Sequence, residues 1–302
     1  MNLPLWGIDL GGTKIEGVIL HPEEISKPVV RTRIDTESFK GYDHIINQIS
    51  QLVKRMKEES RLQPTTIGFG TPGVLDPVLH TMKNCNSTAL NGMPLKKDLE
   101  LELNIPVELA NDANCFALAE TRWGIVKEKC PDAQIVFGII MGTGVGAGVV
   151  INDHVWNGKH GIAGEWGHNF LDESGGQCYC GKIGCVETVI SGPAIERYYE
   201  KITGEKIKLK EISKRCQQGD TAAKQTIERL CDFFGKAVSV VVDILDPDVI
   251  VIGGGVGNID ALYTDGVTAL NQYIFNNRVD VPILKPILGD SAGVFGAAAL
   301  VG

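Results

Sequence analysis

The sequence predicts an α/β protein built from two similar lobes that face each other across a cleft. Three observations support this prediction. Apolar strands alternate with helical segments, each half of the chain contains a strand–glycine turn–strand pattern, and glycine loops directly follow apolar strands. The 302 residues suffice for two medium domains, and no long linker or low-complexity segment interrupts them.

The first half begins with a hairpin. Residues 5–20 read as strand, turn and strand, because β-rich segments flank Gly11 and Gly12. Residues 42–60 place apolar side chains at helical spacing. The segment "TTIGFGTPG" predicts a short strand that ends in a Gly/Pro loop. "NIPVELANDAN" predicts a strand that ends in polar residues, and "CFALAETRWG" continues as a helix.

The second half repeats the opening pattern. "QIVFGIIMGTGVGAGVVIND" reads as strand, glycine turn and strand, and residues 221–245 read as a helix. "PDVIVIGGG" predicts a buried strand that runs into a glycine loop. The tail, "GDSAGVFGAAALVG", predicts a helix of small residues, and either Asp290 or Ser291 is placed to cap its start.

Composition and charge narrow the function classes. The chain is 43% hydrophobic and 22% charged, as in ordinary soluble globular proteins. Its net charge of −8 argues against nucleic acid or an anionic membrane as a partner. We expect no signal peptide, no membrane span and a cytoplasmic location. The eight cysteines would be mostly reduced there, so clustered cysteines indicate a metal before a disulfide.

Three glycine loops are candidate phosphate sites. Glycine lets backbone N–H groups approach phosphate oxygens, a threonine hydroxyl adds a donor, and Asp9 is placed to hold Mg²⁺ through water. The alternative is that these glycines only make tight turns. The spacing fits neither the P-loop nor the Rossmann fingerprint. The candidate residues are Asp9, Gly11, Gly12, Thr13 and Lys14 in the first loop, Gly142, Thr143 and Gly144 in the second, and Gly253, Gly254 and Gly255 in the third.

Asp112, in "LANDAN", follows an apolar strand and precedes an apolar helix. Ligands of α/β proteins bind at such strand ends. A carboxylate there can accept a proton from a substrate hydroxyl while the hydroxyl oxygen attacks phosphorus. Asn111 and Asn114 are candidates for further hydrogen bonds. The alternative is that Asp112 only caps the helix.

The clearest metal pattern is H-x9-C-x-C-x4-C, formed by His168, Cys178, Cys180 and Cys185. Three thiolates and one imidazole complete the tetrahedral shell of a closed, structural zinc site. A redox pair or inert thiols are the alternatives. Glu165 and Glu187 flank the cluster, and carboxylates accept strong hydrogen bonds from sugar hydroxyls. A metal would hold both in place, whereas the alternative is two solvated surface glutamates.

These stretches resemble the ROK family of sugar kinases (repressor, open reading frame, kinase), within the hexokinase/actin-like ATPase superfamily. The resemblance covers nearly the whole chain. Its motifs are "GIDLGGTK", "GTPGVLD", "NDANCFALAE", "GTGVGAG", "GEWGH", "CYCGKIGCVET", "DPDVIVIGGG" and the GD-x-AG-x-x-GAA tail at 289–298.

The resemblance implies roles for particular residues. Asp112 matches the catalytic base, and Asn111, Glu165, His168 and Glu187 match sugar-contacting positions. His168 and the three cysteines match zinc ligands, so His168 would serve both zinc and sugar. The three glycine loops match the ATP-binding loops, and Asp9 matches the acid near Mg²⁺.

The resemblance also implies a two-lobed actin-like/hexokinase-like fold with a small zinc-clipped loop at 164–188. The smaller lobe would comprise residues 1–112 plus 290–302, and the larger lobe residues 113–289. The lobes would close over the sugar, exclude water and limit hydrolysis of ATP. Family habit suggests a homodimer.

The substrate follows from a narrower resemblance. "KNCNSTALNGMPL", residues 83–95, looks most like the fructokinase/mannokinase branch and makes Asn86 a candidate sugar-binding residue. We therefore expect ATP-dependent phosphorylation of the 6-hydroxyl of fructose or mannose. Glucose and N-acetylated amino sugars remain alternatives, because one hydroxyl changes binding by only a few kcal/mol.

Two other function classes are disfavoured. A sugar-responsive repressor of this family would carry a helix-turn-helix domain, for which we expect no room before the hairpin at residue 7. A nicotinamide-dependent oxidoreductase is suggested only by the glycine loops. The remaining cysteines have no evident role beyond filling the core: Cys85, Cys115, Cys130, Cys216 and Cys231.

Overall fold

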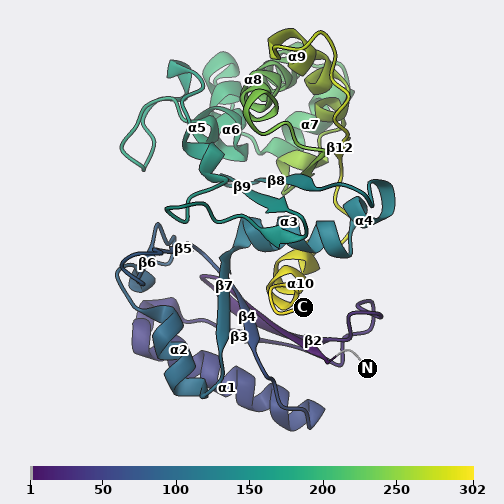
Figure 1. The fold of residues 1–302 in the computed structure, drawn as a ribbon. Coiled ribbons are helices and arrows are strands. Elements are labelled where there is room, and N and C mark those ends of the chain that lie inside the picture. Colours follow the sequence, from purple (N-terminus) through teal and green to yellow (C-terminus); the bar gives the residue numbers. More distant parts are fainter. Residues whose placement is uncertain (1–2) are drawn as a thin grey trace. The chain divides into compact units, whose positions relative to one another are not determined.

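The computed structural model describes residues 3–302, and its internal contacts divide the chain into two compact units (Figure 1). Unit 1 contains the chain up to Lys129 together with Gly148–Ala163 and Ile287–Gly302. Unit 2 contains Cys130–Ala147 and Gly164–Pro286. Met1 and Asn2, with which the first predicted lobe begins, lie outside the described residues. The predicted lobe boundaries stay a prediction.

Unit 1 contains a five-stranded sheet of order β3-β2-β1-β4-β7. The first three strands pair antiparallel, which confirms the predicted hairpin, and β1, β4 and β7 are mutually parallel. The strands are β1 (Leu5–Leu10), β2 (Lys14–Leu20), β3 (Val30–Asp35), β4 (Ile67–Thr71) and β7 (Val107–Asn111), and β5 (Val74–Leu75) and β6 (Met82–Lys83) form a separate ribbon.

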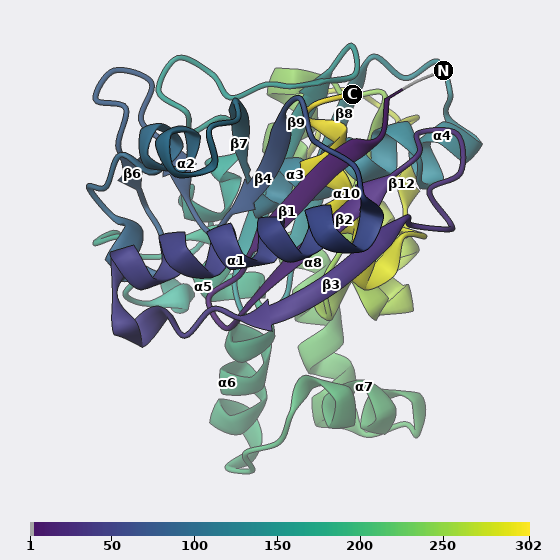
Figure 2. The ribbon, with the colours of Figure 1, turned by 90° about the horizontal axis from the view of Figure 1, so that it is seen from below.

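Helices cover both faces of this sheet. Figure 2 shows α1 (Tyr42–Ser60) lying over β2 and β3, and α2 (Leu95–Leu103) packs beside it. The helix spans the predicted residues and buries one apolar side, which includes Ile49 and Met56. On the other face lie α10 (Ala292–Ala299) and α3 (Asp112–Arg122), which is followed by α4 (Ile125–Lys129).

The small residues of the tail let α10 approach its neighbours closely. A Cβ atom at Gly68 of β4 would lie 1.8 Å from the Ala297 carbonyl oxygen, and one at Gly296 would lie 1.8 Å from the Cys115 carbonyl oxygen. Only glycine fits at these two positions without moving a backbone. The glycine and alanine content that predicted this helix therefore has a packing cause.

The predicted N-cap position of α10 is confirmed for Ser291, but the expected capping bond does not form. Ser291 is the N-cap residue but makes no side-chain capping bond, and its hydroxyl instead accepts a hydrogen bond from Arg31 at 3.0 Å. Its backbone is already right-handed helical, because a 3₁₀ turn at Gly289–Ser291 runs directly into the helix. A side chain needs an extended N-cap backbone to reach the free N–H groups. Asp290 lies inside the same turn.

The second sheet has the order β10-β9-β8-β11-β12. Its hairpin and the parallel strand β11 repeat the arrangement of β1, β2 and β4, which confirms the internal repeat. The division between the units falls within β9, between Ala147 and Gly148. The strands are β8 (Ile135–Met141), β9 (Val145–Ile151), β10 (His154–Val155), β11 (Val249–Gly253) and β12 (Ile283–Leu284).

The longest helix of unit 2, α8 (Thr221–Leu245), has the predicted bounds. It packs against three other helices, α6, α7 and α9, and against the short α5. These are α5 (Val186–Ile190), α6 (Gly192–Thr203), α7 (Leu209–Gln217) and α9 (Asp265–Tyr273). Asp220 caps α8 by accepting the Ala223 N–H at 2.7 Å.

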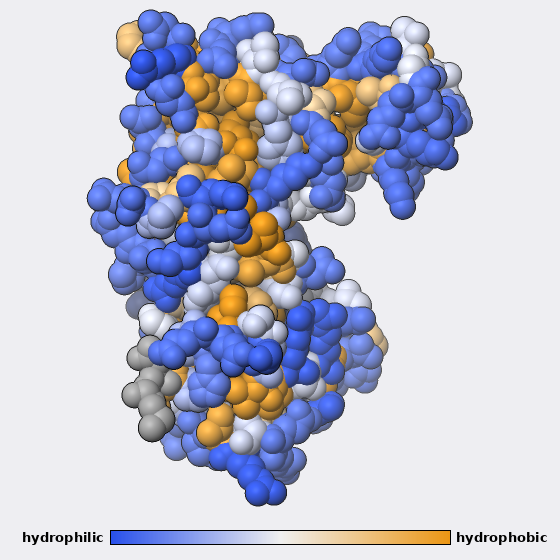
Figure 3. Space-filling model, turned by 90° about the vertical axis from the view of Figure 1, so that its right-hand side faces the viewer, coloured by the Kyte–Doolittle hydropathy of each residue, from blue (hydrophilic) through white to orange (hydrophobic). Residues whose placement is uncertain are grey.

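One face of the molecule and the helices show how hydrophobic residues are distributed. Hydrophilic residues cover most of the face drawn in Figure 3, and hydrophobic patches lie between them. Within residues 3–302, no helix is both long and apolar enough to cross a membrane.

Candidate active site

The carboxyl ends of three parallel strands bring the first group of candidate residues together in unit 1. In the register of β1, β4 and β7, Asp9 pairs with Gly70, and Thr71 pairs with Asn111. Parallel strands end at the same edge of a sheet, which is where ligands of α/β proteins bind. Asp112 follows β7 directly, and its charge helps raise the pKa of Asp9. The two carboxylates therefore share one site.

Asp112 is the first residue of α3 and does not cap it. The cap is Asn111, whose Oδ1 accepts the Asn114 N–H at 2.7 Å. Asp112 accepts the Ala113 N–H at 2.8 Å. Desolvation by the surrounding protein raises the pKa of Asp112, and backbone N–H donors partly oppose this. Asp112 is nevertheless an exposed residue, so a ligand can reach it although the surrounding protein desolvates its carboxylate.

Asn114, a candidate for hydrogen bonds to a ligand, is already hydrogen-bonded within the protein. Its side chain is buried, its Oδ1 accepts the Val149 N–H at 3.3 Å, and its Nδ2 donates to Asn157 at 3.4 Å. It therefore links α3 to residues of the same unit. Asn111 differs, because capping uses only its oxygen and leaves the side-chain NH₂ as a donor.

Asp9 lies between two glycines. A Cβ at Gly70 would lie 3.3 Å from its Oδ1, and one at Gly293 would lie 3.2 Å from its Oδ2. Burial, then Asp112 and Glu16, raise the pKa of Asp9 to about 6, and Arg33 opposes them. Glu16 pairs with Asp9 across β1 and β2, and Arg33 pairs with Glu16 across β2 and β3. This row of charges escaped the sequence analysis, because it depends on strand register.

We expect Asp9→Asn to stabilise the ligand-free protein at neutral pH. The raised pKa means that ionisation of Asp9 disfavours folding, so its stabilising contribution is present below about pH 4 and lost as pH rises through about 6. The variant should gain about 1–3 kcal/mol at pH 8. Urea unfolding in EDTA at pH 4 and pH 8 measures this. A gain that persists at pH 4, or a similar gain in the exposed-loop control Asp132→Asn, would refute the explanation.

The first glycine loop is held by its carbonyl oxygens. Thr36 donates its hydroxyl to the Gly11 carbonyl at 2.7 Å and its N–H to the Thr13 carbonyl at 2.8 Å, and Ser38 donates to the Gly12 carbonyl at 3.0 Å. Lys14 is exposed at the start of β2. This anchoring leaves the N–H side of the turn as the side that can face a phosphate.

Residues 83–95 lie next to this loop. A Cβ at Gly12 would lie 3.1 Å from Ser87 Oγ. Asn86 is exposed, and its backbone N–H donates to the Pro72 carbonyl at 3.2 Å. Asn91 holds the turn by bonding both the N–H and the carbonyl of Cys85. Asn86 therefore lies near the strand ends that carry Asp9 and Asp112.

The second glycine loop contacts Glu187, one of the residues predicted to bind the sugar. In unit 2, Glu187 Oε2 accepts the Val145 N–H at 3.0 Å, and a Cβ at Gly144 would lie 2.5 Å from the same oxygen. The Gly142 carbonyl accepts the Gly192 N–H at 2.8 Å. Thr143 is exposed at the tip. The absence of a side chain at Gly144 therefore makes room for the Glu187 carboxylate.

The third loop requires glycine at one position only. Gly254 has φ of +82°, and a Cβ there would lie 2.2 Å from the Met141 carbonyl oxygen. Gly255 has φ of −63° and open space around it. Gly253 ends β11 and is buried.

We expect Gly254→Ala to lower the free energy of unfolding by more than about 2 kcal/mol, because it combines a left-handed backbone with a backbone clash. Gly255→Ala is the matched control and should change stability by less than about 0.5 kcal/mol. Thermal and urea unfolding of both variants test this. Equal losses would show that neither φ nor the clash decides the effect.

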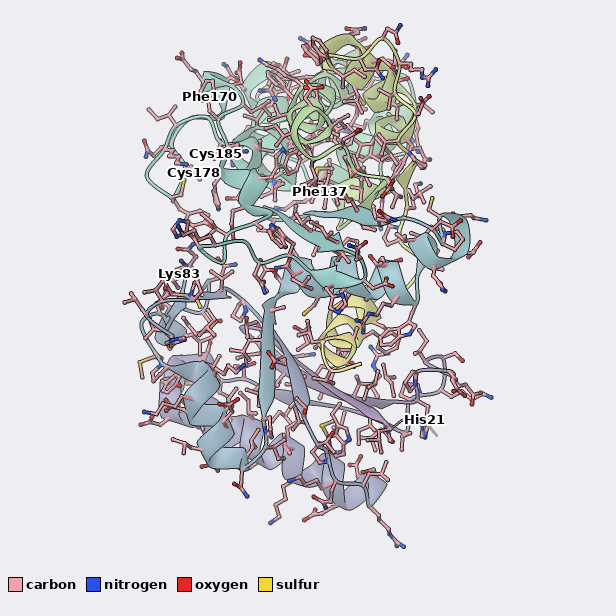
Figure 4. All side chains as sticks on the ribbon, viewed as in Figure 1. His21, Lys83, Phe137, Phe170, Cys178 and Cys185 are labelled. Carbon is pink, nitrogen blue, oxygen red and sulfur yellow. The ribbon has the colours of Figure 1, made fainter. Side chains whose placement is uncertain are left out.

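Four side chains of unit 2 form a compact cluster. The ligand atoms of His168, Cys178, Cys180 and Cys185 all lie within 4.8 Å of one another, and Figure 4 labels Cys178 and Cys185 side by side in the loop before α5. Cys178 Sγ lies 3.6 Å from His168 Nδ1, and Cys180 Sγ lies 3.6 Å from Cys185 Sγ.

These spacings fit a tetrahedral zinc ion. Zn–S bonds of about 2.3 Å and Zn–N bonds of about 2.0–2.1 Å place neighbouring ligand atoms about 3.5–3.8 Å apart. A disulfide would require sulfur atoms about 2.05 Å apart, and the three thiols are free. Four protein donors leave no open coordination position, so the cluster fits a structural site.

The two predicted sugar-binding glutamates lie in turns directly next to the cluster. Glu165 and His168 belong to one 3₁₀ turn, Glu165–His168, and α5 begins directly after Cys185, with Glu187 in its first turn. Gly184, with φ of +72°, lets the loop fold back, because a Cβ there would lie 2.5 Å from the Asp172 carbonyl oxygen. Each glutamate is thus within three residues of a cluster residue.

One residue at the cluster escaped the sequence analysis. Tyr179, between Cys178 and Cys180, places its hydroxyl 3.0 Å from His168 Nε2. Burial, followed by the charges of Glu187 and Glu165, raises the pKa of Tyr179 to about 12. The sequence shows an aromatic residue between two predicted metal ligands. This pattern alone does not distinguish a residue that contacts His168 from an ordinary surface residue.

The other cysteines divide into two groups. Cys85, Cys115 and Cys231 are buried, as expected for core residues, and burial raises the pKa of each thiol. Cys130 and Cys216 are only half-buried, so they are not core residues.

Comparisons with known proteins identify a family and several similar proteins. The model of the ROK family matches residues 5–302. An N-acetyl-D-glucosamine kinase of Pasteurella multocida (strain Pm70) is 35% identical, with 98% of each chain covered. The crystal structure of a ROK hexokinase from Thermus thermophilus is 29% identical, with a TM-score of 0.87, and covers 99% of this chain and 97% of that one. A ROK family glucokinase from Streptomyces griseus, in complex with glucose and AMPPNP, is 27% identical, with a TM-score of 0.77 and 98% coverage of both chains.

Proposed function

We propose, since this chain belongs to the ROK family, that it transfers a phosphoryl group from ATP to the 6-hydroxyl of N-acetylglucosamine. The observation that carries the proposal is the pair of carboxylates at the strand ends of unit 1, where Asp112 is exposed and Asp9 is half-buried. Relatives named N-acetyl-D-glucosamine kinase support the choice of sugar.

Fructose or mannose is the second candidate acceptor. The pattern in residues 83–95 favours it, but the similar curated proteins do not confirm this branch. Both candidates use the same chemistry and the same residues, because a primary hydroxyl is the nucleophile in each case. The choice between them depends on groups that contact the rest of the sugar.

Asp112 supplies the base in this proposal. Its carboxylate accepts the proton of the sugar hydroxyl while the hydroxyl oxygen bonds to the γ-phosphorus, and the bond from that phosphorus to the oxygen of ADP breaks. The transition state is loose, so Asp112 mainly orients the hydroxyl. Desolvation makes its carboxylate a stronger base, and its exposed position leaves it accessible to substrate.

The phosphates would be held by backbone N–H groups of the three glycine loops. Thr13 and Thr143 add hydroxyl donors, Lys14 adds a positive charge, and Asp9 would hold Mg²⁺ through water. The ion neutralises charge on the phosphates when it is bound. The resemblance implies these roles for Asp9 and the glycine loops, and the hydrogen bonds that anchor the carbonyls of the first loop support them.

Each unit offers its own candidate sugar-binding side chains. In unit 2, Glu165 and Glu187 would accept hydrogen bonds from sugar hydroxyls. In unit 1, Asn86 and the side-chain NH₂ of Asn111 would donate hydrogen bonds. Zinc held by His168 and the three cysteines would keep both glutamates in position, with no part in the chemical step. The expected homodimer and cytoplasmic location stay predictions.

The experiment measures ADP release from MgATP with N-acetylglucosamine, N-acetylmannosamine, glucose, fructose and mannose. We expect the highest kcat/KM with N-acetylglucosamine. A preference for fructose or mannose would retain the kinase and restore the interpretation of residues 83–95. No turnover with any sugar, by folded protein that contains zinc, would refute the proposal.

A further inference from the structure

Tyr179 occupies a position that neither the metal cluster nor the proposed phosphoryl transfer explains. Its ring stands at 89° to the His168 ring, with centroids 5.1 Å apart, and its hydroxyl lies 3.0 Å from His168 Nε2. Tyr179 is 74% exposed, although both of its neighbours in the chain, Cys178 and Cys180, belong to the cluster. A large aromatic side chain held by its hydroxyl and open on its ring is suited to contact a ligand.

The cluster determines which atom donates in this hydrogen bond. His168 directs Nδ1 toward Cys178 Sγ, so Nδ1 offers its lone pair to the metal position. A neutral imidazole that binds through Nδ1 carries its proton on Nε2. Nε2–H therefore donates to Tyr179 Oη, and the Tyr179 hydroxyl keeps its own O–H as a free donor.

The neighbouring groups are acceptors. Glu165 belongs to the same 3₁₀ turn as His168, and Glu187 lies two residues after Cys185. Glu187 Oε2 already accepts the Val145 N–H. Ionised carboxylates accept hydrogen bonds from sugar hydroxyls but cannot donate to a carbonyl oxygen. An N-acetyl group presents such an oxygen, so a site for an acetylated sugar needs an O–H or N–H donor beside the two glutamates.

We propose that Tyr179 is a specificity-determining residue, whose O–H donates to the acetamido carbonyl oxygen of an N-acetylated amino sugar. The inference rests on the proposed sugar kinase function. It predicts that loss of the hydroxyl affects acetylated sugars more than plain hexoses, because a glucose hydroxyl at the same place can instead donate to a carboxylate.

The test is Tyr179→Phe, which keeps the ring and removes the hydroxyl. We expect kcat/KM for N-acetylglucosamine to fall about tenfold, and that for glucose to fall less than threefold. Calorimetric titration without ATP should show the same loss of affinity for N-acetylglucosamine. Zinc content should stay at the wild-type value, since no metal ligand is changed.

Tyr198→Phe is the matched control. It removes a hydroxyl that accepts a hydrogen bond from Gln225, outside the cluster, and should leave kcat/KM for both sugars unchanged. An unchanged ratio of the two kcat/KM values in Tyr179→Phe would overturn the inference, whether both fall equally or neither falls. Wild-type protein that phosphorylates glucose in preference to N-acetylglucosamine would overturn it while the kinase remains. Wild-type protein that binds no sugar would overturn the proposed function as well.

Discussion

Replacement of Asp112 by asparagine should lower kcat by about 10³-fold and leave the affinity for the sugar within about threefold of wild type. Asparagine can still accept the Ala113 N–H that Asp112 accepts at 2.8 Å, so the start of α3 is preserved. What is lost is the carboxylate that takes the proton from the sugar hydroxyl. Steady-state kinetics, with calorimetric sugar binding in the absence of ATP, separate the two effects.

Glu108→Gln provides the control for removal of a carboxylate nearby in the sequence, on the strand β7 that precedes Asp112. Glu108 is exposed on β7, where it pairs with Lys96 at 3.3 Å, and it has no part in the proposed chemistry. Its kcat should remain within about twofold of wild type. Near-normal turnover in Asp112→Asn would remove Asp112 from the role of base.

Replacement of Cys180 by serine should have the largest effect on stability. The variant loses one of four ligands, so we expect zinc content below one per chain and a lower melting temperature. An ion present at about 100 times its Kd stabilises the fold by about 2.7 kcal/mol, which sets the scale of the loss. Sugar affinity should fall with it, because Glu165 and Glu187 lie in turns attached to the cluster.

Cys216→Ser is the matched control, since Cys216 is half-buried on α7 of the same unit and outside the cluster. It should retain zinc, and its melting temperature should stay close to wild type. Metal analysis, thermal unfolding and sugar titration are measured on both variants. A Cys180→Ser protein without zinc but with unchanged sugar affinity would separate the cluster from the sugar site.

The fold was largely predictable because its signals are local. Residues 42–60 and 221–245 form helices with the predicted bounds, since a period of 3.6 in apolar residues is readable without knowledge of any partner. Glycine turns likewise predicted both hairpins. The hexokinase-like fold expected from the resemblance is confirmed by the similarity to the Thermus thermophilus enzyme.

The candidate site was predictable in part. The spacing of His168 and the three cysteines predicted the cluster, because ligand type and loop length are sequence properties. The predicted sugar stays unconfirmed: a pattern in residues 83–95 favours fructose or mannose, whereas the curated relatives reported above are named N-acetyl-D-glucosamine kinase. A substituent on the sugar is recognised by single donors and acceptors, and their positions depend on contacts between distant parts of the chain.

The sequence by itself determined the strands, the helices, the glycine turns and the chemical types of the site residues, since short-range geometry governs all of these. Only the tertiary structure decided that Asn111 rather than Asp112 caps α3, and that Asp9, Glu16 and Arg33 form one row. It also decided that the Tyr179 hydroxyl meets His168 Nε2. Strand register and loop folding determine such contacts, and they arise from the packing of the whole unit rather than from any local pattern.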